Sequence, residues 1–343
     1  MPVTIRRPAA ARAGSVARAG VTALLAAPTH VIGMHGMGDN IHQRAIIREL
    51  MQRGAVQLET PWPSIYHDLV GPQLRLVRKA TSLRTQAKNA AREQDKYADV
   101  KRSAVRQIRI WYRREDVLQH GSILGAMCAN ANVRNRDFSL PVPDAWKQMA
   151  RPFLSGWTNG KPLLFYRPLV MRTEWGGCAS RNPDKDAYHE IFAAIRDQFY
   201  VVSVADLVPN VEWVVSHPVG ADVEFHHGEL TFEVLAVIMQ RASLSFASPG
   251  FATHLAQAVG TPAVCVFGGH ESSMVISGGA ALAPTLGIDP IEPCNCFLST
   301  HPCKKTIDVP KAVAKLRTFV ETHVHADPVI ANPTNSRQLE LAF

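Results

Sequence analysis

The stretch His30-Val31-Ile32-Gly33-Met34-His35-Gly36-Met37-Gly38-Asp39 decides the fold class of this 343-residue chain. Residues 31–34 are a short apolar run, which is typical of a buried strand. The run leads into a glycine turn over residues 36–39, and apolar residues then recur at helical spacing between positions 45 and 51. A strand, a glycine turn and a helix in this order predict the first βα unit of a Rossmann-like domain.

The same alternation continues along the chain. Residues 56–59 predict a second strand, and residues 120–160, rich in Gly, Asn, Pro and Trp with weak periodicity, indicate an interdomain region. Further strands are predicted at 163–166, 200–204, 212–216, 244–246 and 263–267, and helices at 187–199, 232–242, 252–259 and 309–324. We therefore expect an α/β protein of two Rossmann-like domains facing a cleft. Its predicted segments are a basic disordered tail (1–28), an N-terminal acceptor domain (29–155), a C-terminal nucleotide-sugar domain (156–325) and a tail (326–343).

Composition excludes several classes of protein. With 46% hydrophobic and 19% charged residues the chain is not a disordered one. Its apolar stretch at 21–27 is far shorter than a membrane span, so we expect a soluble protein. Residues 1–38 contain arginines and no acid, which favours a solvated basic tail over the alternative, a cleaved signal. Six cysteines are too few for a disulfide scaffold and indicate a reducing, cytoplasmic compartment.

The basic charge of the chain is concentrated in one segment. The net charge is +8, whereas residues 75–114 alone hold 13 Lys and Arg against three acids. This segment is either a solvated helical face or a contact surface for an acidic partner. A phosphorylated sugar, a membrane surface and a nucleic acid would all meet that description.

Three segments resemble a known family. They are His35-Gly36-Met37-Gly38-Asp39-Asn40-Ile41, then Gly228-Glu229-Leu230-Thr231-Phe232-Glu233-Val234-Leu235, and the stretch 248–262 that contains His254-Leu255-Ala256-Gln257-Ala258-Val259-Gly260-Thr261-Pro262 and runs into an apolar strand and Phe267-Gly268. In this order and spacing they resemble the heptosyltransferase-like glycosyltransferases of glycosyltransferase family 9, which have the GT-B fold. The resemblance implies an inverting, metal-independent transfer from a nucleotide-diphospho-sugar, which is a co-substrate, with no cofactor.

Asp39 matches the aspartate that ends the glycine turn of that family, so we expect it to be the general base for the acceptor hydroxyl. The alternative is that Asp39 only caps the following helix. Gly250 precedes a predicted helix whose N-terminal amides and dipole favour an anion such as a diphosphate. His254, in the first turn, is either a further donor to that anion or a packed core residue.

The expected site residues fall into two groups. Those expected to bind the donor are Gly250, Ala252, Thr253, His254, Thr231, Lys185, Arg167 and Arg172. Those expected to bind the acceptor are Gly38, Asn40, His42, Arg84 and Lys88. We also expect Thr231 to be a helix N-cap. Each of the basic residues could instead be an ordinary surface charge without a ligand.

Two features depart from the family or stand outside it. Pro249 occupies a position where many members of the family have an acidic residue that binds the donor sugar or ribose. Three explanations are open: Glu229 or Glu271 binds these hydroxyls instead, the donor differs from ADP-heptose, or the enzyme is inactive. Cys294, Cys296, His301 and Cys303 form a C-x-C-x4-H-x-C set of soft ligands, suited either to structural zinc or to free, redox-sensitive thiols. We expect no catalytic metal.

The favoured function is a glycosyltransferase that builds a bacterial lipopolysaccharide or another surface glycan. It would be cytoplasmic, with peripheral contact to the inner membrane through residues 75–114. One alternative is a transferase that glycosylates modified bases in DNA, because the same basic segment would neutralise phosphates. Another is a GT-B binding protein that has lost catalysis, and a sugar-nucleotide epimerase is a weaker one.

Overall fold

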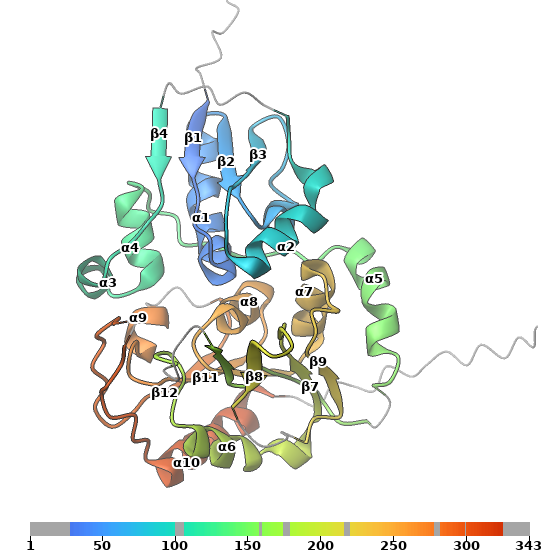
Figure 1. Cartoon of the computed structure of the whole chain (residues 1–343), viewed down its shortest axis with the longest axis vertical. Coiled ribbons are helices and arrows are strands. Elements are labelled where there is room, and N and C mark those ends of the chain that lie inside the picture. The colour runs from blue at the N-terminus through green and yellow to red at the C-terminus, as the bar shows by residue number, and fades with distance from the viewer. Residues whose placement is uncertain are drawn as a thin grey trace, which may run out of the picture.

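The computed structural model describes residues 28–99, 106–157, 160–173, 179–215, 220–277, 282–298 and 300–324. Apart from residue 28, the two predicted tails lie outside these ranges. The described residues form two α/β units stacked one above the other, with the carboxyl ends of β1 and β4 directed toward the lower unit (Figure 1).

The N-terminal unit contains a four-stranded parallel sheet of order β3-β2-β1-β4. Its strands are β1 (Thr29–Ile32), β2 (Val56–Thr60), β3 (Leu74–Arg78) and β4 (Arg106–Arg109). Its helices are α1 (Met37–Arg53), α2 (Arg84–Arg92), α3 (Arg114–His120) and α4 (Ile123–Asn130), with short 3-10 turns η1 (Pro63–Tyr66) and η2 (Gln94–Lys96). The predicted opening of strand, glycine turn and helix is confirmed in β1 and α1.

The C-terminal unit contains a six-stranded parallel sheet of order β12-β11-β10-β5-β7-β9. Its strands are β5 (Leu163–Tyr166), β7 (Tyr200–Val204), β9 (Val223–Phe225), β10 (Leu244–Ala247), β11 (Ala263–Val266) and β12 (Thr285–Ile288). Renumbered from its own first strand, this is the order 6-5-4-1-2-3 of a complete Rossmann sheet. The expected pair of Rossmann-like units is confirmed.

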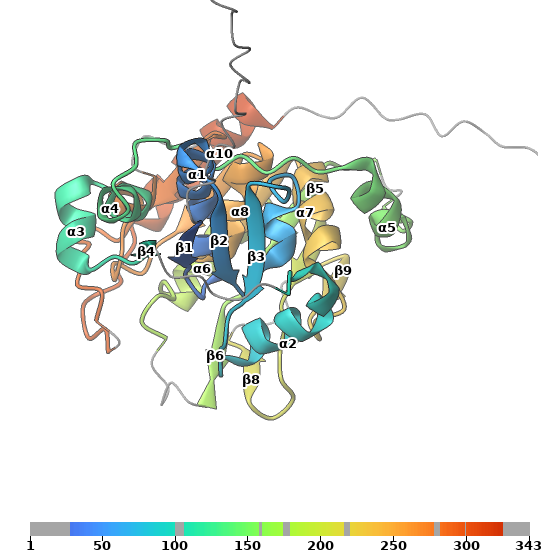
Figure 2. The ribbon, with the colours of Figure 1, turned by 90° about the horizontal axis from the view of Figure 1, so that it is seen from above.

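The helices of this unit are α6 (Lys185–Ala193), α7 (Phe232–Arg241), α8 (Phe251–Val259), α9 (Ser273–Ser277) and α10 (Val309–His323), with a 3-10 turn η4 (Arg196–Gln198). A separate antiparallel pair, β6 (Val170–Arg172) and β8 (Glu212–Val214), lies beside α2, whereas α10 lies on the opposite side of the molecule (Figure 2). The strand predicted at 212–216 is therefore real but belongs to this small sheet.

The weakly periodic region 120–160 is more structured than the sequence indicates. It contains α4 and α5 (Asp144–Leu154), and α5 packs against α7 of the C-terminal unit. Weak periodicity in α4 has a physical reason, since nearly the whole helix is buried and has no polar face. Among the described residues, no helix has the length and apolarity needed to cross a bilayer.

The two units share one hydrophobic core where α1 faces α8. A Cβ on Gly38 would lie 2.5 Å from Cδ2 of His254, so glycine is needed for this close approach. The main-chain amide of Leu140 donates to the carbonyl of Ala258 at 2.8 Å, which ties the connecting segment to the end of α8. The close approach of Gly38 to His254 places the start of α1 beside the start of α8.

Candidate active site

A cavity of about 400 Å³ lies between the two units, where the strand order of each sheet changes direction. In the N-terminal sheet that point falls between β1 and β4, and in the C-terminal sheet it falls between β5 and β10. Loops leaving two such neighbouring strands diverge, and ligands of open α/β sheets bind in the crevice they leave. Asp39 and Tyr112 follow the upper pair, and Arg167 and Gly250 follow the lower pair; all four line the cavity.

Asp39 lies in the first turn of α1 and is surrounded by protein on all sides but the cleft. The hydroxyl of Tyr112 donates to its Oδ1 at 3.3 Å. Burial raises the pKa of Asp39 to about 6, the charge of Arg181 and the Tyr112 hydrogen bond oppose this rise, and the charge of Glu271 adds to it. Asp39 is therefore ionised at neutral pH yet close to its titration point.

Helix capping does not explain Asp39. The N-cap of α1 is Gly36, and no side chain caps the helix. A Cβ on Gly36 would lie 2.6 Å from Oδ2 of Asp39, so this glycine makes room for the carboxylate above the helix start. The alternative that Asp39 is the cap is wrong, and Asp39 lines the cavity.

The opposite wall is the N-terminus of α8. Gly250 has a φ of 158° and caps the helix with its main chain, without a side-chain hydrogen bond. The first amides of an α-helix have no partner within the helix, so this end can receive an anion. Phe251 and His254 of the first turn line the cavity. Burial lowers the pKa of His254 to about 4, so the imidazole is neutral at neutral pH.

Two arginines stand near this helix end. The guanidinium of Arg167 lies 5.5 Å from the ring centre of Phe251 and donates to the carbonyl of Val204 at 2.7 Å. Burial lowers the pKa of Arg167 to about 10, which leaves it charged at neutral pH. Nε of Arg181 lies 3.4 Å from Oε1 of Glu271, and this carboxylate raises the pKa of Arg181.

Glu271 is almost fully buried, whereas half of the Arg181 side chain is exposed to the cleft. The Oε2 atom of Glu271 is buried without a hydrogen-bond partner in the part of the chain that the structure describes. A buried carboxylate oxygen without a donor is costly.

The structure brings together half of the residues expected from the sequence. Those that line the cavity are Gly38, Asp39, Lys88, Arg167, Arg172, Gly250 and His254. Those that do not are Asn40, His42, Arg84, Lys185, Thr231, Ala252 and Thr253.

Local packing explains the second set. The amide of Asn40 donates to the carbonyls of Met34 and Gly36, which closes the turn before α1. The His42 ring packs between Phe138 and His254, at centroid distances of 4.9 and 4.1 Å. These contacts make Asn40 and His42 structural residues, contrary to their expected role at the acceptor.

Among the residues expected to bind the donor, Ala252 and Thr253 of α8 are buried and do not line the cavity. Thr231 is the N-cap of α7 and accepts from the amide of Val234 at 3.4 Å, which confirms its structural role. Lys185 is exposed at the first residue of α6. Arg181, four residues earlier, is the cation that reaches the cleft.

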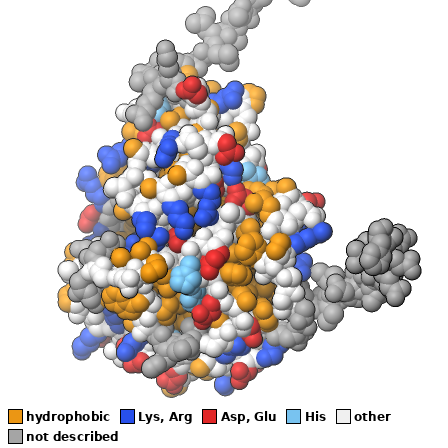
Figure 3. Space-filling model, turned by 45° about the vertical axis from the view of Figure 1, so that its right-hand side comes forward, with side chains coloured by type: hydrophobic (Ala, Val, Ile, Leu, Met, Phe, Trp, Pro, Cys, Tyr) orange, Lys and Arg blue, Asp and Glu red, His pale blue; other side chains and the backbone are white. Residues whose placement is uncertain are grey.

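Part of the basic segment contacts the protein itself. The described residues of 75–114 include most of β3, α2, η2 and β4, and four cations, spaced four residues apart, contact the C-terminal unit, whereas others such as Arg75, Arg106 and Arg109 are exposed. The four contacts are Arg84 with Glu212 (2.9 Å), Lys88 with Asp206 (3.1 Å), Arg92 with the carbonyls of Gly228 and Leu230 (3.4 and 3.3 Å), and Lys96 with Glu233. We call these four the interdomain stripe. Lys and Arg side chains cross the middle of the face in Figure 3, with acidic side chains close below them.

Sequence reasoning missed Tyr112, Arg181 and Asp206, which all line the cavity. Tyr112 follows β4, a strand without an apolar pattern. Arg181 lies four residues before Lys185, which was expected to bind the donor, and its position on the loop before α6 gave no signal of its own. Glu271, considered as a substitute for the acid missing at position 249, does line the cavity, whereas Glu229 does not.

No protein-family model and no curated protein match the sequence. Among solved structures, the glycosyl transferase of family 9 from Veillonella parvula matches with a TM-score of 0.52 and 12% identity over 88% of this chain and 98% of that one. The ADP-heptose lipopolysaccharide heptosyltransferase II of Escherichia coli matches with a TM-score of 0.52 and 14% identity over 86% and 99%. This chain has the GT-B fold.

A third match is the iron-containing dodecameric glycosyltransferase TibC of enterotoxigenic E. coli H10407, with a TM-score of 0.51 and 13% identity over 86% of this chain and 75% of that one. The GT-B fold accounts for the two stacked Rossmann sheets and for a cleft between their carboxyl ends. The resemblance found in the sequence is thus confirmed at the level of the fold.

Proposed function

We propose that this protein is a glycosyltransferase that uses a nucleotide-diphospho-sugar. The observation that carries the proposal is the pair of opposite walls of the cleft, with Asp39 on one and the N-terminus of α8 on the other. Such an arrangement suits a reaction in which a hydroxyl loses a proton on one side while an anionic group leaves on the other. A TibC structure containing ADP-D-β-D-heptose supports this class of donor.

In the proposed reaction the diphosphate of the donor binds at the start of α8, and Arg167 and Arg181 face its oxygens as charged donors. Asp39 accepts the proton of the acceptor hydroxyl as the hydroxyl oxygen attacks the anomeric carbon. The bond from that carbon to the diphosphate oxygen breaks, and its electron pair stays with the leaving nucleoside diphosphate. Attack from the face opposite the leaving group inverts the anomeric configuration.

The charges in the cleft make a divalent cation unnecessary in this proposal. A helix N-terminus and two arginines neutralise the departing diphosphate, which is the task a metal ion performs in other transferases. Glu271 replaces the acid that is absent at position 249, because it lines the cavity beside Arg181. It would accept a hydroxyl of the ribose or of the donor sugar.

We propose a bacterial lipopolysaccharide or another surface glycan as the acceptor, at the cytoplasmic side of the inner membrane. The similarity to the E. coli lipopolysaccharide heptosyltransferase supports this class. The alternative of a DNA acceptor rests on the basic segment, of which four cations, the interdomain stripe, contact groups of the protein instead.

The test is a thermal-shift panel of nucleoside diphosphates and their sugars, with and without added Mg²⁺. A ligand at about 100 times its Kd stabilises the folded state by about 2.7 kcal/mol, which is readily measured. We expect one nucleoside diphosphate and its sugar to shift Tm without Mg²⁺, and Arg181→Ala to reduce that shift. A folded protein that no nucleotide shifts would refute donor binding. A donor that binds without turnover with any glycan would favour the inactive binding protein.

A further inference from the structure

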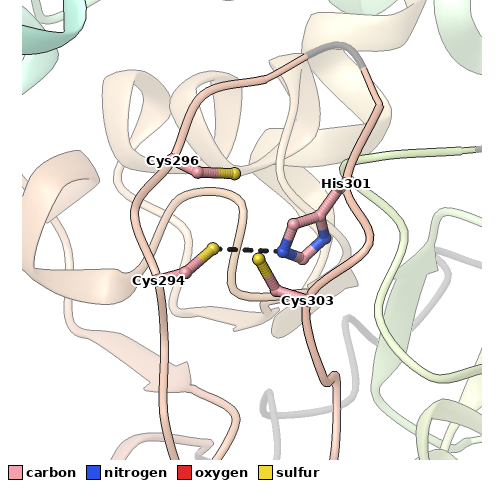
Figure 4. A group of neighbouring side chains, drawn as sticks. All are labelled: Cys294, Cys296, His301 and Cys303. Atoms are coloured by element: carbon pink, nitrogen blue, oxygen red, sulfur yellow. Dashed lines mark hydrogen bonds between the residues drawn. The ribbon is translucent and has the colours of Figure 1, made fainter.

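Four potential metal ligands converge in the loop between β12 and α10, away from the cavity lining (Figure 4). They are Cys294, Cys296, His301 and Cys303, and their ligand atoms all lie within 4.8 Å of one another. Sγ of Cys294 lies 3.1 Å from Nε2 of His301. In Figure 4 the three sulfur atoms and the imidazole point into one common space.

The size of this space fits one tetrahedral ion. Zn–S bonds of about 2.3 Å and Zn–N bonds of about 2.0 Å place the ligand atoms of a tetrahedral site about 3.5 to 3.8 Å apart. The observed separations bracket these values, so small side-chain rotations would bring all four atoms to bonding distance.

The chemistry of the set also selects the ion. Three sulfurs and one imidazole are the ligands of structural zinc sites, and four protein ligands leave no open position for a substrate. All four residues come from a stretch of ten residues, and the three cysteines are unpaired in the structure.

The backbone of the loop supports a clamp at this place. Asn295 and Phe297, on either side of Cys296, have φ angles of 47° and 55°, a left-handed conformation that residues other than glycine seldom adopt. Such a conformation persists where surrounding contacts impose it. We propose that Cys294, Cys296, His301 and Cys303 bind one structural Zn²⁺ that holds this loop in shape.

The loop held by the ion contacts both sides of the cleft. The amides of Asn295 and Phe297 donate to the carbonyls of Gly269 and His270, immediately before Glu271. The carbonyl of Asn295 accepts from Nε of Arg114, at the start of α3 in the N-terminal unit, at 2.7 Å. The ion would therefore position Glu271 from behind without touching a substrate.

The test is elemental analysis of the full-length protein, purified under reducing conditions without chelator. We expect about one zinc per chain, and the same stoichiometry of Co²⁺ after exchange, with the absorption bands of thiolate–cobalt bonds. Cys303→Ser and His301→Ala should lose the metal, whereas His301→Cys, which supplies a fourth thiolate, should retain it. Cys128→Ala, a buried cysteine of α4 outside the cluster, is the control and should keep one zinc per chain.

A second readout separates loss of metal from loss of fold. A zinc chelator should lower the Tm of the wild type by several degrees, and should leave the Tm of folded Cys303→Ser unchanged. Less than a tenth of a zinc per chain after incubation with Zn²⁺ would overturn the proposal. So would a disulfide within the cluster, detected as two thiols fewer than the six of the chain. Iron in place of zinc would overturn the choice of ion. None of these outcomes depends on donor binding.

Discussion

Replacing Asp39 by Asn tests the assignment of the base, because activity and stability should move in opposite directions. General base catalysis contributes about 10²- to 10⁴-fold, so Asp39→Asn should lower kcat by that factor. At 1.36 kcal/mol for each tenfold change, this is about 3 to 5 kcal/mol of the activation barrier. The amide oxygen of Asn can still accept the Tyr112 hydrogen bond, which makes the variant nearly isosteric.

The effect on stability follows from the raised pKa. The carboxyl of Asp39 titrates near 6 in the folded protein and near 3.8 in the unfolded chain. Below pH 3.8 it is protonated in both states and costs nothing. Between 3.8 and 6 the unfolded chain ionises first, so stability falls as pH rises, and above 6 the full cost of about 3 kcal/mol is present. Asp39→Asn removes this cost and should raise the free energy of unfolding at pH 8 by up to about 3 kcal/mol, and by about half as much at pH 5.

Two assays check these expectations. Release of nucleoside diphosphate, measured with the donor from the thermal-shift panel, gives kcat/KM against pH. In the wild type kcat/KM should fall tenfold for each pH unit below about 6, and any residual activity of Asp39→Asn should lack this limb. Urea unfolding at pH 5 and pH 8 gives the stabilities. A variant within threefold of wild-type kcat, or one less stable than wild type at pH 8, would refute the argument.

Three further substitutions test the packing and the charges around the cleft. Gly38→Ala places a Cβ 2.5 Å from the packed His254 ring and should lower the free energy of unfolding in urea by about 1 to 3 kcal/mol. Gly71→Ala is the control and should leave stability unchanged, because a Cβ there meets nothing within 4 Å. Equal losses of stability in the two variants would contradict the close approach of α1 to α8. The pKa of His254 is lowered from 6.5 to about 4 in the folded protein, so this histidine binds a proton more tightly once the chain is unfolded. The wild type should therefore lose about 3 kcal/mol of stability as pH falls from 7 to 4, and His254→Gln should remove this loss. An unchanged pH dependence would show that this ring is not the group that titrates. Glu212→Gln weakens the contacts of a buried carboxylate with Arg84 and Arg172 and should lower the free energy of unfolding by about 2 to 4 kcal/mol. Asp144→Asn, in an exposed pair with Lys147, is the control and should leave the urea midpoint in place. If Glu212→Gln also left the stability unchanged, these ion pairs would be contradicted.

The sequence predicted those elements whose formation depends on residues close together in the chain, and missed those that depend on distant residues. The helices α7 and α8 and the strands β5 and β11 follow from apolar patterns, and their boundaries agree within a few residues, whereas α1 begins at Met37, inside the stretch predicted as a glycine turn. Strand β4 has mostly exposed polar residues, and it forms because its main chain pairs with β1, from Thr29 with Arg106 to Ile32 with Arg109. Without β4 the sequence did not place Tyr112 beside Asp39.

The basic segment shows the same limit most clearly. The cations at 84, 88, 92 and 96 have the spacing of one helix face, a pattern visible in the sequence. Their partners lie more than 100 residues further on, so the pattern predicted a charged face and did not reveal what it faces. Charge balance over the whole chain pointed to an external acidic partner, whereas for these four cations the folded chain supplies carboxylates and carbonyls of its own.

This use of the charge has a consequence for the cleft. Glu212 and Glu233 expose less than a tenth of their side chains, while the stripe cations Arg84 and Lys96 stay more than a third exposed. Exposed cations alone add little to stability, but a buried carboxylate that loses its cation is strongly destabilised. Separating the two units would take Arg84 away from Glu212, which keeps Arg172, and Lys96 away from Glu233, so the stripe favours the arrangement in which Asp39 faces α8. Because salt screens such ion pairs, high ionic strength should loosen the contact between the units.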